Sequence, residues 1–355
     1  MKKIKVGKKI ISKNSKTYFI ADIGANHDGD LRRAKKLIKL CAKAGADAAK
    51  FQHFRAKTIV SDFQFKKLNI NTHQKKWKKS VYEVYNDASI NSLWNKILKK
   101  ECKKNNIDFL TSPYDLNYVD EVNKFIPAYK IGSGDITWKD IIIKIAKKKK
   151  PVIIATGAST FTDVMNAVKL ILKYNSKLIV MQCNTNYTAD EKNFNHINLN
   201  VLKQFSRTFK DKIILGLSDH TQGHTTVLGA IALGAKVIEK HFTDDNKRKG
   251  PDHKFSMTPE TWHTMVIESR RLEKSLGDGI KKVEKNEITS FVVQRRGVYA
   301  NRKIKKNEKL KKEMIEFLRP YLKGSISPFE IENYIGKKLK KDFKEHEVIK
   351  KKWMI

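Results

Sequence analysis

The chain has 355 residues, of which 40% are hydrophobic and 31% charged, and its formal net charge is +37. This length accommodates one large domain and one small domain, each with its own core. No run approaches 18 apolar residues, and the first residues, MKKIKVGKKII, lack a cleavage signal, so we expect a cytosolic protein without a membrane span or signal peptide. Cys41, Cys102 and Cys183 are too few and too widely spaced for a disulfide framework or a four-ligand zinc site.

Apolar, β-branched runs alternate with longer segments of helical period along the first 275 residues. The first run is followed by an amphipathic stretch from Leu31 to Ala44, and the second by a long insertion and then a helix near 91–104. Each of the six later runs precedes a segment that predicts a helix. The expected strands are 17–24, 47–52, 107–112, 128–134, 151–157, 177–183, 213–218 and 236–242.

Eight strands, each followed by a helix, predict an α/β fold of the closed (β/α)8 TIM barrel type. An open, doubly wound sheet is the alternative, but the chain lacks the glycine fingerprint of a dinucleotide-binding fold. The pattern changes after Leu276, where 278–294 is a polar connector and the remaining residues have short extended pieces and turn signals. We therefore expect a barrel domain at 1–277, a linker at 278–294 and a small mixed or mostly β domain at 295–355.

Polar residues stand at the carboxyl end of every predicted strand, where a barrel carries its active site. Lysines, histidines and carboxylates recur there, and such groups are seldom buried without partners. This recurrence predicts an active site. The residues concerned are Asp22, Lys50, Gln52, Ser112, Lys130, Ser133, Asp135, Thr156, Thr185, Tyr187, Ser218, Asp219, His220, Glu239 and His241.

Two histidines, His220 and His241, end neighbouring strands, which places both imidazoles within reach of one ion. With Asp219 and Glu239 beside them, they predict a catalytic divalent metal with open coordination, acting as a Lewis acid on a carbonyl. Such ligands suit a borderline ion such as manganese, iron, cobalt or zinc. Manganese is the first expectation, with magnesium or cobalt as alternatives.

Lys50 and Lys130 are the cations of a predicted anion site. Charged amines with short hydroxyl donors suit a phosphate or a carboxylate. The hydroxyls are those of Ser133, Thr156, Thr185 and Ser218. A Schiff-base role for one lysine, as in some barrel aldolases, is the competing interpretation.

Several strings of this sequence closely resemble the sialic acid synthase (N-acetylneuraminate synthase) family of bacterial nonulosonic acid synthases. They are ADIGANHDGD, GADAAKFQ, AYKIGSGD, GLSDHTQGH, ALGAKVIEKHFT and GPDHKFSM. In the tail, RRGVYANRKIKKNEKL, FLRP and ISPFE resemble the antifreeze-like, SAF-type domain of that family. The resemblance runs from about residue 17 to 350.

The resemblance implies a homodimer in which the small domain closes over the barrel of the partner subunit. It implies that phosphoenolpyruvate condenses with the open-chain aldehyde of an N-acetylated hexosamine, giving a nine-carbon 2-keto acid and phosphate. By the same resemblance, His220 and His241 bind the metal, and Glu239 or Asp22 assists the water proton. The phosphoenolpyruvate site takes Lys50, Lys130, Ser133, Thr185 and Ser218, and the sugar site takes Gln52, Tyr187, Asp252 and Arg319.

Three departures from the family pattern concern the acceptor. Asp22 and Asp135 stand where glutamate is usual, Ala155 where serine is frequent, and Thr188 where proline commonly follows the tyrosine. A carboxylate one methylene shorter is displaced by roughly 1 Å, which matters in a positioned site. N-acetylmannosamine is the first expected acceptor, followed by the diacetamido-trideoxyhexoses that lead to legionaminic or pseudaminic acid.

The net charge has another possible meaning, a basic nucleic-acid-binding protein that uses the barrel as a scaffold. However, the 74 basic residues comprise 63 lysines and only 11 arginines, and they are dispersed along the chain. Arginine reads bases and grips phosphates in pairs of hydrogen bonds, whereas lysine is a solvated point charge. A dispersed lysine excess is typical of an AT-rich coding bias, so we expect no nucleic-acid partner and at most a mild attraction of anionic substrates.

Overall fold

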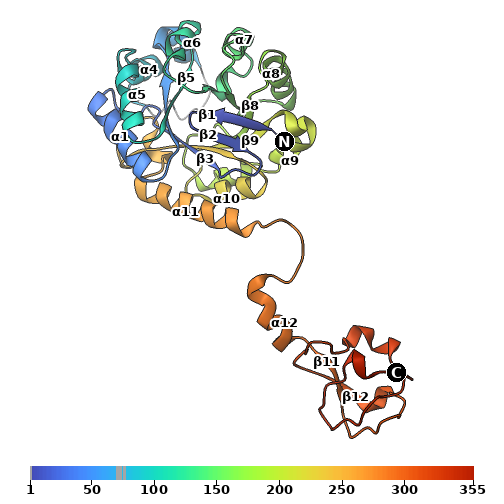
Figure 1. Cartoon of the computed structure of the whole chain (residues 1–355). Coiled ribbons are helices and arrows are strands. Elements are labelled where there is room, and N and C mark those ends of the chain that lie inside the picture. The colour runs from blue at the N-terminus through green and yellow to red at the C-terminus, as the bar shows by residue number, and fades with distance from the viewer. Residues whose placement is uncertain (1, 69–73, 75–76) are drawn as a thin grey trace. The chain divides into compact units, whose positions relative to one another are not determined.

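Eight parallel strands form a closed barrel in the computed structural model, which describes residues 2–68, 74 and 77–355 (Figure 1). The barrel closes because the last strand, β10, pairs with the first, β3. The prediction of a closed TIM-type barrel is therefore confirmed, and the open sheet is excluded. The strands are β3 Tyr18–Asp22, β4 Ala48–His53, β5 Asp108–Pro113, β6 Tyr129–Ile131, β7 Val152–Ala155, β8 Leu178–Cys183, β9 Ile214–Asp219 and β10 Val237–His241.

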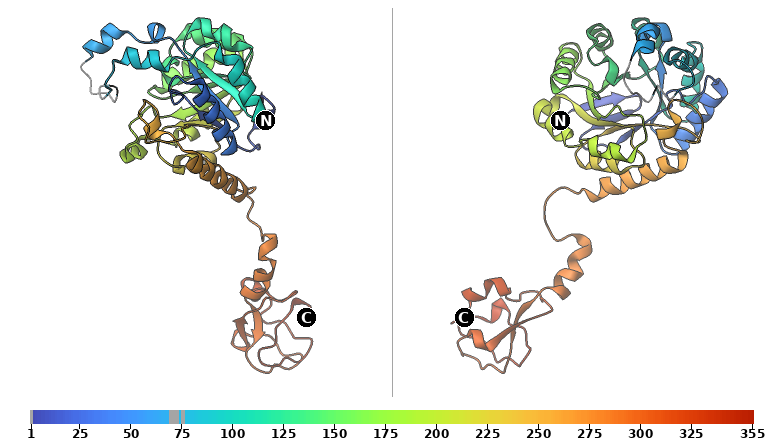
Figure 2. Two further views of the ribbon diagram at one scale, coloured as in Figure 1. Left: turned by 90° about the vertical axis from the view of Figure 1, so that its left-hand side faces the viewer. Right: turned by 180° about the vertical axis from the view of Figure 1, so that it is seen from behind.

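A ring of helices surrounds the barrel, one after each strand (Figure 2). Helix α8 illustrates why these segments fold: Val164, Ala167, Val168 and Ile171 are buried at helical spacing, and Thr160 begins the helix with a capping box. The helices of the ring are α1 Leu31–Lys43, α5 Trp94–Lys104, α6 Leu116–Asn123, α7 Lys139–Lys147, α8 Phe161–Tyr174, α9 Val201–Phe209, α10 Thr225–Ala232 and α11 Pro259–Ser275.

An antiparallel hairpin covers the amino-terminal end of the barrel. It consists of β1 Lys3–Val6 and β2 Lys9–Ser12, and Ile4, Val6 and Ile11 join the same buried cluster as the first lumen residues of the barrel strands. Gly7 makes the turn at φ +54°, where a Cβ atom would lie 2.0 Å from Asp108 Oδ1. The hydrophobic pattern of these residues does not predict this plug.

The insertion between β4 and α5 contributes short helices at the other end of the barrel. They are α2 Ala56–Ile59, α3 Asp62–Lys67 and α4 Val81–Ala88. Several loops of the barrel unit also contain single turns of 3-10 helix: η2 Ser133–Asp135, η3 Glu191–His196, η4 Lys210–Lys212 and η5 His253–Phe255.

The chain divides into two compact units, Met1–Gly277 and Asp278–Ile355. The second unit has its own core, in which Val298, Leu310, Ile326 and Ile349 are fully buried. The expected polar connector at 278–294 contains helical residues, and the rest of the unit is a small β domain with 3-10 turns. Its elements are η6 Lys285–Glu287, α12 Ile288–Gln294, β11 Gly297–Ala300, η7 Lys312–Met314, β12 Ile315–Leu318, η8 Pro328–Asn333 and η9 Lys351–Trp353.

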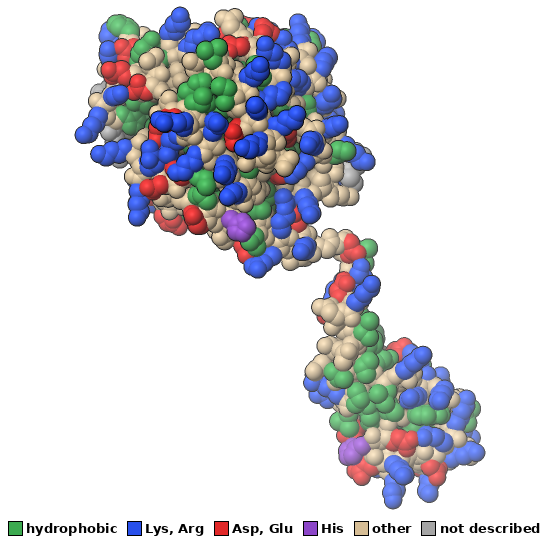
Figure 3. Space-filling view, turned by 60° about the vertical axis from the view of Figure 1, so that its left-hand side comes forward, with side chains coloured by type: hydrophobic (Ala, Val, Ile, Leu, Met, Phe, Trp, Pro, Cys, Tyr) green, Lys and Arg blue, Asp and Glu red, His purple; other side chains and the backbone are tan. Residues whose placement is uncertain are grey.

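Basic side chains are spread over the surface rather than gathered in one patch on the face shown in Figure 3. This distribution agrees with the dispersed lysine excess of the sequence. Across the described part of the chain, no helix combines the length and hydropathy needed to cross a bilayer.

Candidate active site

Side chains that point into the barrel change from apolar to charged along the strands. Alternate residues of each strand face the lumen. Near the hairpin, these inward-facing residues are apolar and fill the lumen. One step further toward the carboxyl ends, the same alternation brings polar side chains into the lumen. The apolar layer includes Ile20, Ala48, Leu110, Ala128, Ile153, Ile179 and Val237, and the polar layer includes Asp22, Lys50, Ser112, Lys130, Ser218 and Glu239.

Four charged side chains meet in the polar layer, each no more than 4% exposed. Lys50 Nζ lies 2.6 Å from Asp22 Oδ2 and 3.6 Å from Glu239 Oε1, and Lys130 Nζ lies 2.7 Å from Glu239 Oε1. Two cations and two anions therefore balance one another, which is the condition under which such groups tolerate burial. Glu239 Oε2 is also buried and has no hydrogen-bond partner among the described residues.

The charge cluster shifts the pKa values of Asp22 and Lys50. Burial alone would raise the pKa of Asp22, but Lys50 and His241 outweigh it and lower this pKa to about 2. Burial would lower the pKa of Lys50, yet Asp22 and Glu239 raise it above its usual value. Both groups are therefore charged at neutral pH. A permanently protonated Lys50 is a poor Schiff-base nucleophile, so the cluster favours the anion-binding interpretation.

His220 and His241 lie directly above this cluster, with their ring centroids 5.4 Å apart. His220 Nδ1 is hydrogen-bonded to the carbonyl oxygen of Asn184 at 2.8 Å. His241 Nδ1 is buried and has no hydrogen-bond partner within the described part of the chain. It lies 3.7 Å from Asp252 Oδ2, and His241 Nε2 lies 3.5 Å from Asp22 Oδ2. Burial lowers the pKa of His241, which keeps its imidazole in the neutral form that binds metals.

The two imidazoles fit a divalent cation that is held by few protein ligands. Within the residues that the structure describes, no group of three or more His, Cys, Asp or Glu side chains is arranged to hold a metal ion. The Asp219 carboxylate, expected beside His220, is engaged elsewhere: it accepts hydrogen bonds from Thr221 and Thr226 and pairs with Lys240. A cation held by His220 and His241 would keep its other coordination positions open to substrate or water.

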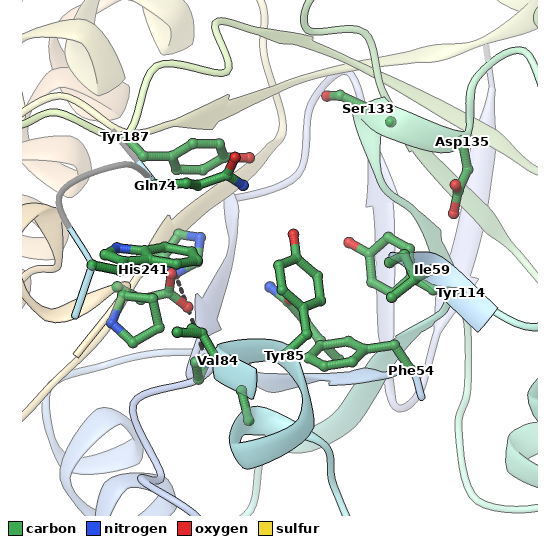
Figure 4. A pocket seen from close by; sticks show the side chains of 17 residues that line it. Phe54, Ile59, Gln74, Val84, Tyr85, Tyr114, Ser133, Asp135, Tyr187 and His241 are labelled. Atoms are coloured by element: carbon green, nitrogen blue, oxygen red, sulfur yellow. Dashed lines mark hydrogen bonds and ion pairs between the residues drawn. The ribbon is translucent and has the colours of Figure 1, made fainter. Parts of the chain in front are cut away.

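A cavity of about 430 Å³ opens above the charge cluster (Figure 4). The sequence predicted six of its lining residues: Gln52, Ser133, Asp135, Tyr187, His241 and Asp252. Burial raises the pKa of Asp135 to about 6, so this carboxyl titrates close to neutrality. Asp252 Oδ2 accepts a hydrogen bond from the backbone N–H of Ala25 at 2.9 Å, which fixes its position.

Sequence reasoning missed one wall of this cavity, which is largely aromatic. Phe54 packs against Tyr85 and Tyr114 with ring centroids 5.2 and 6.2 Å apart, and Ile59 and Val84 extend the wall. Phe54, Ile59, Val84 and Tyr85 lie between β4 and α5, and Tyr114 directly follows β5. The position of the insertion in the sequence could have predicted this wall, because an insertion at the carboxyl end of a barrel strand lies where ligands bind.

Two residues of the predicted anion site, Ser133 and Thr185, lie close together around Gly157. Ser133 Oγ accepts from the N–H of Gly157 at 2.9 Å, and a Cβ atom on Gly157 would lie 2.5 Å from Thr185 Cγ2. These segments therefore come close together only because residue 157 is glycine. The Cys183 thiol, which was not predicted as a site residue, lies at the same place: its Sγ atom would be 3.1 Å from a Cβ atom on residue 157.

Thr156, the third hydroxyl of the predicted anion site, is hydrogen-bonded to the neighbouring strand. Its hydroxyl donates to the carbonyl oxygen of Met181 at 2.9 Å, so it is used within the sheet. Ser218 Oγ lies 3.4 Å from Glu239 Oε1, and Ser112 is buried. Arg319, expected at the sugar site, is an exposed residue of the second unit, directly after β12.

Comparison with known proteins agrees with this architecture. The NeuB family model matches residues 37–281, and the SAF domain model matches residues 295–352. The N,N'-diacetyllegionaminic acid synthase of Campylobacter jejuni subsp. jejuni serotype O:2 is 37% identical over 94% of this chain and 99% of its own length. The pseudaminic acid synthase of the same organism is 32% identical over 95% and 96%.

A solved structure shares the fold. The N-acetylneuraminic acid synthetase of Leptospira borgpetersenii superposes with a TM-score of 0.71 and 27% identity, covering 81% of this chain and 95% of that protein. The family model spans more than half of the chain, and the first relative matches nearly its whole length. The chain is an enzyme that belongs to the NeuB family, with a SAF domain following its barrel.

Proposed function

We propose that this enzyme joins C3 of phosphoenolpyruvate to the aldehyde carbon of an open-chain N-acetylated hexosamine, releasing phosphate and a nine-carbon 2-keto acid. One observation carries the proposal: Lys50 and Lys130 form a buried cationic pair below His220 and His241, at the carboxyl end of a NeuB-family barrel. Buried amines provide strong binding for a substrate that carries both a carboxylate and a phosphate.

Lys50 and Lys130 hold the two anionic groups of phosphoenolpyruvate in this proposal, with Ser133, Thr185 and Ser218 as hydroxyl donors. As C3 attacks the aldehyde, positive charge develops at C2. Asp22 and Glu239, 2.6 and 2.7 Å from the lysines, offset that charge without moving. Water then adds at C2, and phosphate leaves as the C2–O bond breaks, so the new carbonyl oxygen comes from water.

Glu239 is our candidate for the group that takes the proton of this water. None of the residues that the structure describes is hydrogen-bonded to its Oε2 atom, which can therefore accept a proton. Asp22, the other candidate, already accepts from the N–H of Gly24 at 3.0 Å and from Gln52 Nε2 at 3.1 Å, in addition to Lys50. Asp22 therefore suits a positioning role for Lys50.

A divalent cation, with Mn²⁺ as our first choice, would be held by His220 and His241. When bound, it supplies Lewis-acid polarisation of the aldehyde oxygen. The orphaned Nδ1 of His241 supports this assignment, because a buried ring nitrogen without a partner is costly in the absence of a ligand.

For the acceptor, we propose an N-acetylated hexosamine with a second acetamido group. The aromatic wall of Phe54, Tyr85 and Tyr114 provides apolar contact for a second acetyl methyl group. The identity to a relative named N,N'-diacetyllegionaminic acid synthase supports the same choice. Gln52, Tyr187 and Asp252, which line the same cavity, supply polar contacts.

Release of phosphate from phosphoenolpyruvate tests the proposal directly. The full-length enzyme is incubated with Mn²⁺ or Mg²⁺ and a panel of sugars that contains N-acetylmannosamine and 2,4-diacetamido-2,4,6-trideoxyhexoses. The molecular masses of the products are measured by mass spectrometry. We expect sugar-dependent phosphate release and a product heavier than the acceptor by one pyruvate unit. Absence of phosphate release with every sugar would reject the condensation, whereas a preference for N-acetylmannosamine would reject only the acceptor assignment.

A second subunit completes the site in this proposal, through Arg319 of its SAF domain. The apolar side chains of Ile280, Ile288 and Val293 are 67%, 60% and 46% exposed, which supports burial of this segment in a homodimer. For Arg319→Ala we expect the KM for the sugar to rise about 10- to 100-fold, because a hydrogen bond from a charged group is lost. The KM for phosphoenolpyruvate should change little. Equal changes in both KM values would remove Arg319 from the sugar site.

A further inference from the structure

Lys240 and Asp219 form an ion pair behind the two histidines, on the side of the sheet that faces the helices. The two residues are direct neighbours in the register of β9 and β10, and they are 1% and 2% exposed. Because side chains alternate along a strand, Asp219 shares its side with Leu217, and Lys240 shares its side with Ile238. The pair thus lies outside the lumen that holds the charge cluster.

The layer between strands and helices is otherwise uncharged. On their helix-facing side, the eight barrel strands, all within the described residues, carry no Asp, Glu, Lys or Arg besides these two. A buried ion pair costs desolvation, and apolar side chains of similar size often give equal or greater stability. Stability alone therefore does not explain why the pair occurs at this position of the barrel.

Hydrogen bonds connect the pair to the segment that follows His220. Lys240 Nζ donates to the carbonyl oxygen of Thr221 at 2.6 Å, in addition to Asp219. Asp219 Oδ2 accepts from Thr221 Oγ1 and from Thr226 Oγ1, each at 2.8 Å. Because Thr226 belongs to α10, the network joins β9, β10, the turn after β9 and the first turn of a helix.

Each partner of the pair is flanked along its strand by site residues: Asp219 by Ser218 and His220, and Lys240 by Glu239 and His241. A rotation of either strand end would therefore move an imidazole. We propose that Lys240 and Asp219 are positioning residues, which hold His220 and His241 at the separation that a shared cation requires. This inference rests on the proposed role of the two histidines.

The test uses the double variant Asp219→Asn with Lys240→Met, which removes both charges together, so that neither is left buried and unpaired. Mn²⁺ alone is titrated into the full-length protein, and crystal structures give the separation of the two imidazole centroids. We expect a folded protein whose apparent Kd for Mn²⁺ rises about tenfold or more, the usual cost of losing support around metal ligands. We also expect a ring separation that departs from the 5.4 Å of the native chain.

The matched control removes the ion pair of Lys9 and Asp47 at the opposite end of the barrel, by Lys9→Met with Asp47→Asn. Its Kd for Mn²⁺ should equal that of the native chain. The inference is overturned if the double variant retains both the native Kd and the native ring separation, or if the control weakens Mn²⁺ binding equally.

A milder substitution covers the case in which the double variant does not fold. Thr226→Val removes one hydrogen bond to Asp219 and keeps the ion pair, and we expect a smaller rise in the Kd, about two- to fivefold, for the loss of one hydrogen bond. An unchanged Kd in a folded Thr226→Val chain would then overturn the inference. If the native chain itself binds no Mn²⁺, the proposed metal role fails, and the ring separation in the variants still decides whether the pair positions the histidines.

Discussion

The two ends of the barrel lumen differ in chemistry although the same eight strands build both. Near the hairpin, the inward side chains form an apolar core that Ile4, Val6 and Ile11 seal. Toward the carboxyl ends, the inward layer includes buried, paired charges, and no described residue is hydrogen-bonded to Glu239 Oε2. The alternation of the strands is unchanged, so the difference lies only in residue type.

This contrast separates stability from reactivity within one sheet. Apolar packing stabilises the fold without chemical demands, whereas buried charges cost desolvation and are retained at functional sites. Substitutions in the apolar end should therefore change the free energy of unfolding, and substitutions in the charged end should change turnover.

Removal of a histidine is expected to give the largest effect. In His220→Ala, turnover should fall to the rate that the native enzyme shows without added metal, because the cation would lose one of its two protein ligands. Phosphate release is measured across a Mn²⁺ titration, with His263→Ala, on the outer helix α11, as the control. Metal-dependent turnover at the native level in His220→Ala would contradict the ligand assignment.

Glu239→Gln keeps the size of the side chain and removes its basicity. We expect kcat to fall by about 10²- to 10⁴-fold, the usual contribution of a general base. Since Lys130 loses its charged partner, thermal unfolding is recorded alongside to confirm that the variant is folded. Asp22→Asn serves as the comparison, and a larger fall in kcat for that variant would transfer the proton-accepting role to Asp22.

Leu110→Ala tests the apolar end. Loss of this fully buried side chain should lower the free energy of unfolding by about 2–5 kcal/mol, because a cavity remains in a packed core. Urea unfolding measures this change, and kcat per folded molecule should stay at the native value. A fall in kcat comparable to that of Glu239→Gln would show that the two ends are not functionally separate.

Asp135→Asn is expected to alter mainly the pH dependence of stability. The pKa of Asp135 is raised by burial from 3.8 to about 6, so the folded state binds its proton more tightly than the unfolded state does. The resulting stability is fully present below about pH 4 and is lost as the pH rises through about 6. The Tm of the variant relative to the native chain should therefore rise between about pH 4 and pH 7, and parallel Tm curves would contradict this assignment.

The barrel could be predicted because its strands are buried on both faces. Segments such as TYFIADIG and KLIVMQC read as continuous apolar runs, and all eight predicted strands are present within a few residues of their expected ends. The hairpin plug was missed because its segments are short and rich in lysine, so neither has a strong period. Its function as a plug depends on contacts with strands far away in the sequence.

The polar ends of the strands were harder to interpret, for a physical reason. In GLSDH and VIEKH, consecutive residues are polar, so the sequence does not show which of them face the lumen. Asp219 was expected beside the metal and instead faces the helices, and Thr156 bonds within the sheet. The aromatic wall was missed although most of its members come from the insertion after β4, because the sequence of that insertion does not show which side chains face the cavity.

The closing seam of the barrel, where β10 pairs with β3, has a consequence for the order of assembly during synthesis. Asp22 and Lys50 emerge from the ribosome early and are close in sequence, but Glu239 and His241 belong to β10, the last barrel strand in the sequence. Until that strand docks, Lys130 lacks its carboxylate partner and the two imidazoles are apart. Because such long-range contacts form late, a nascent or truncated chain that ends before β10 would have most of the scaffold and none of the proposed chemistry.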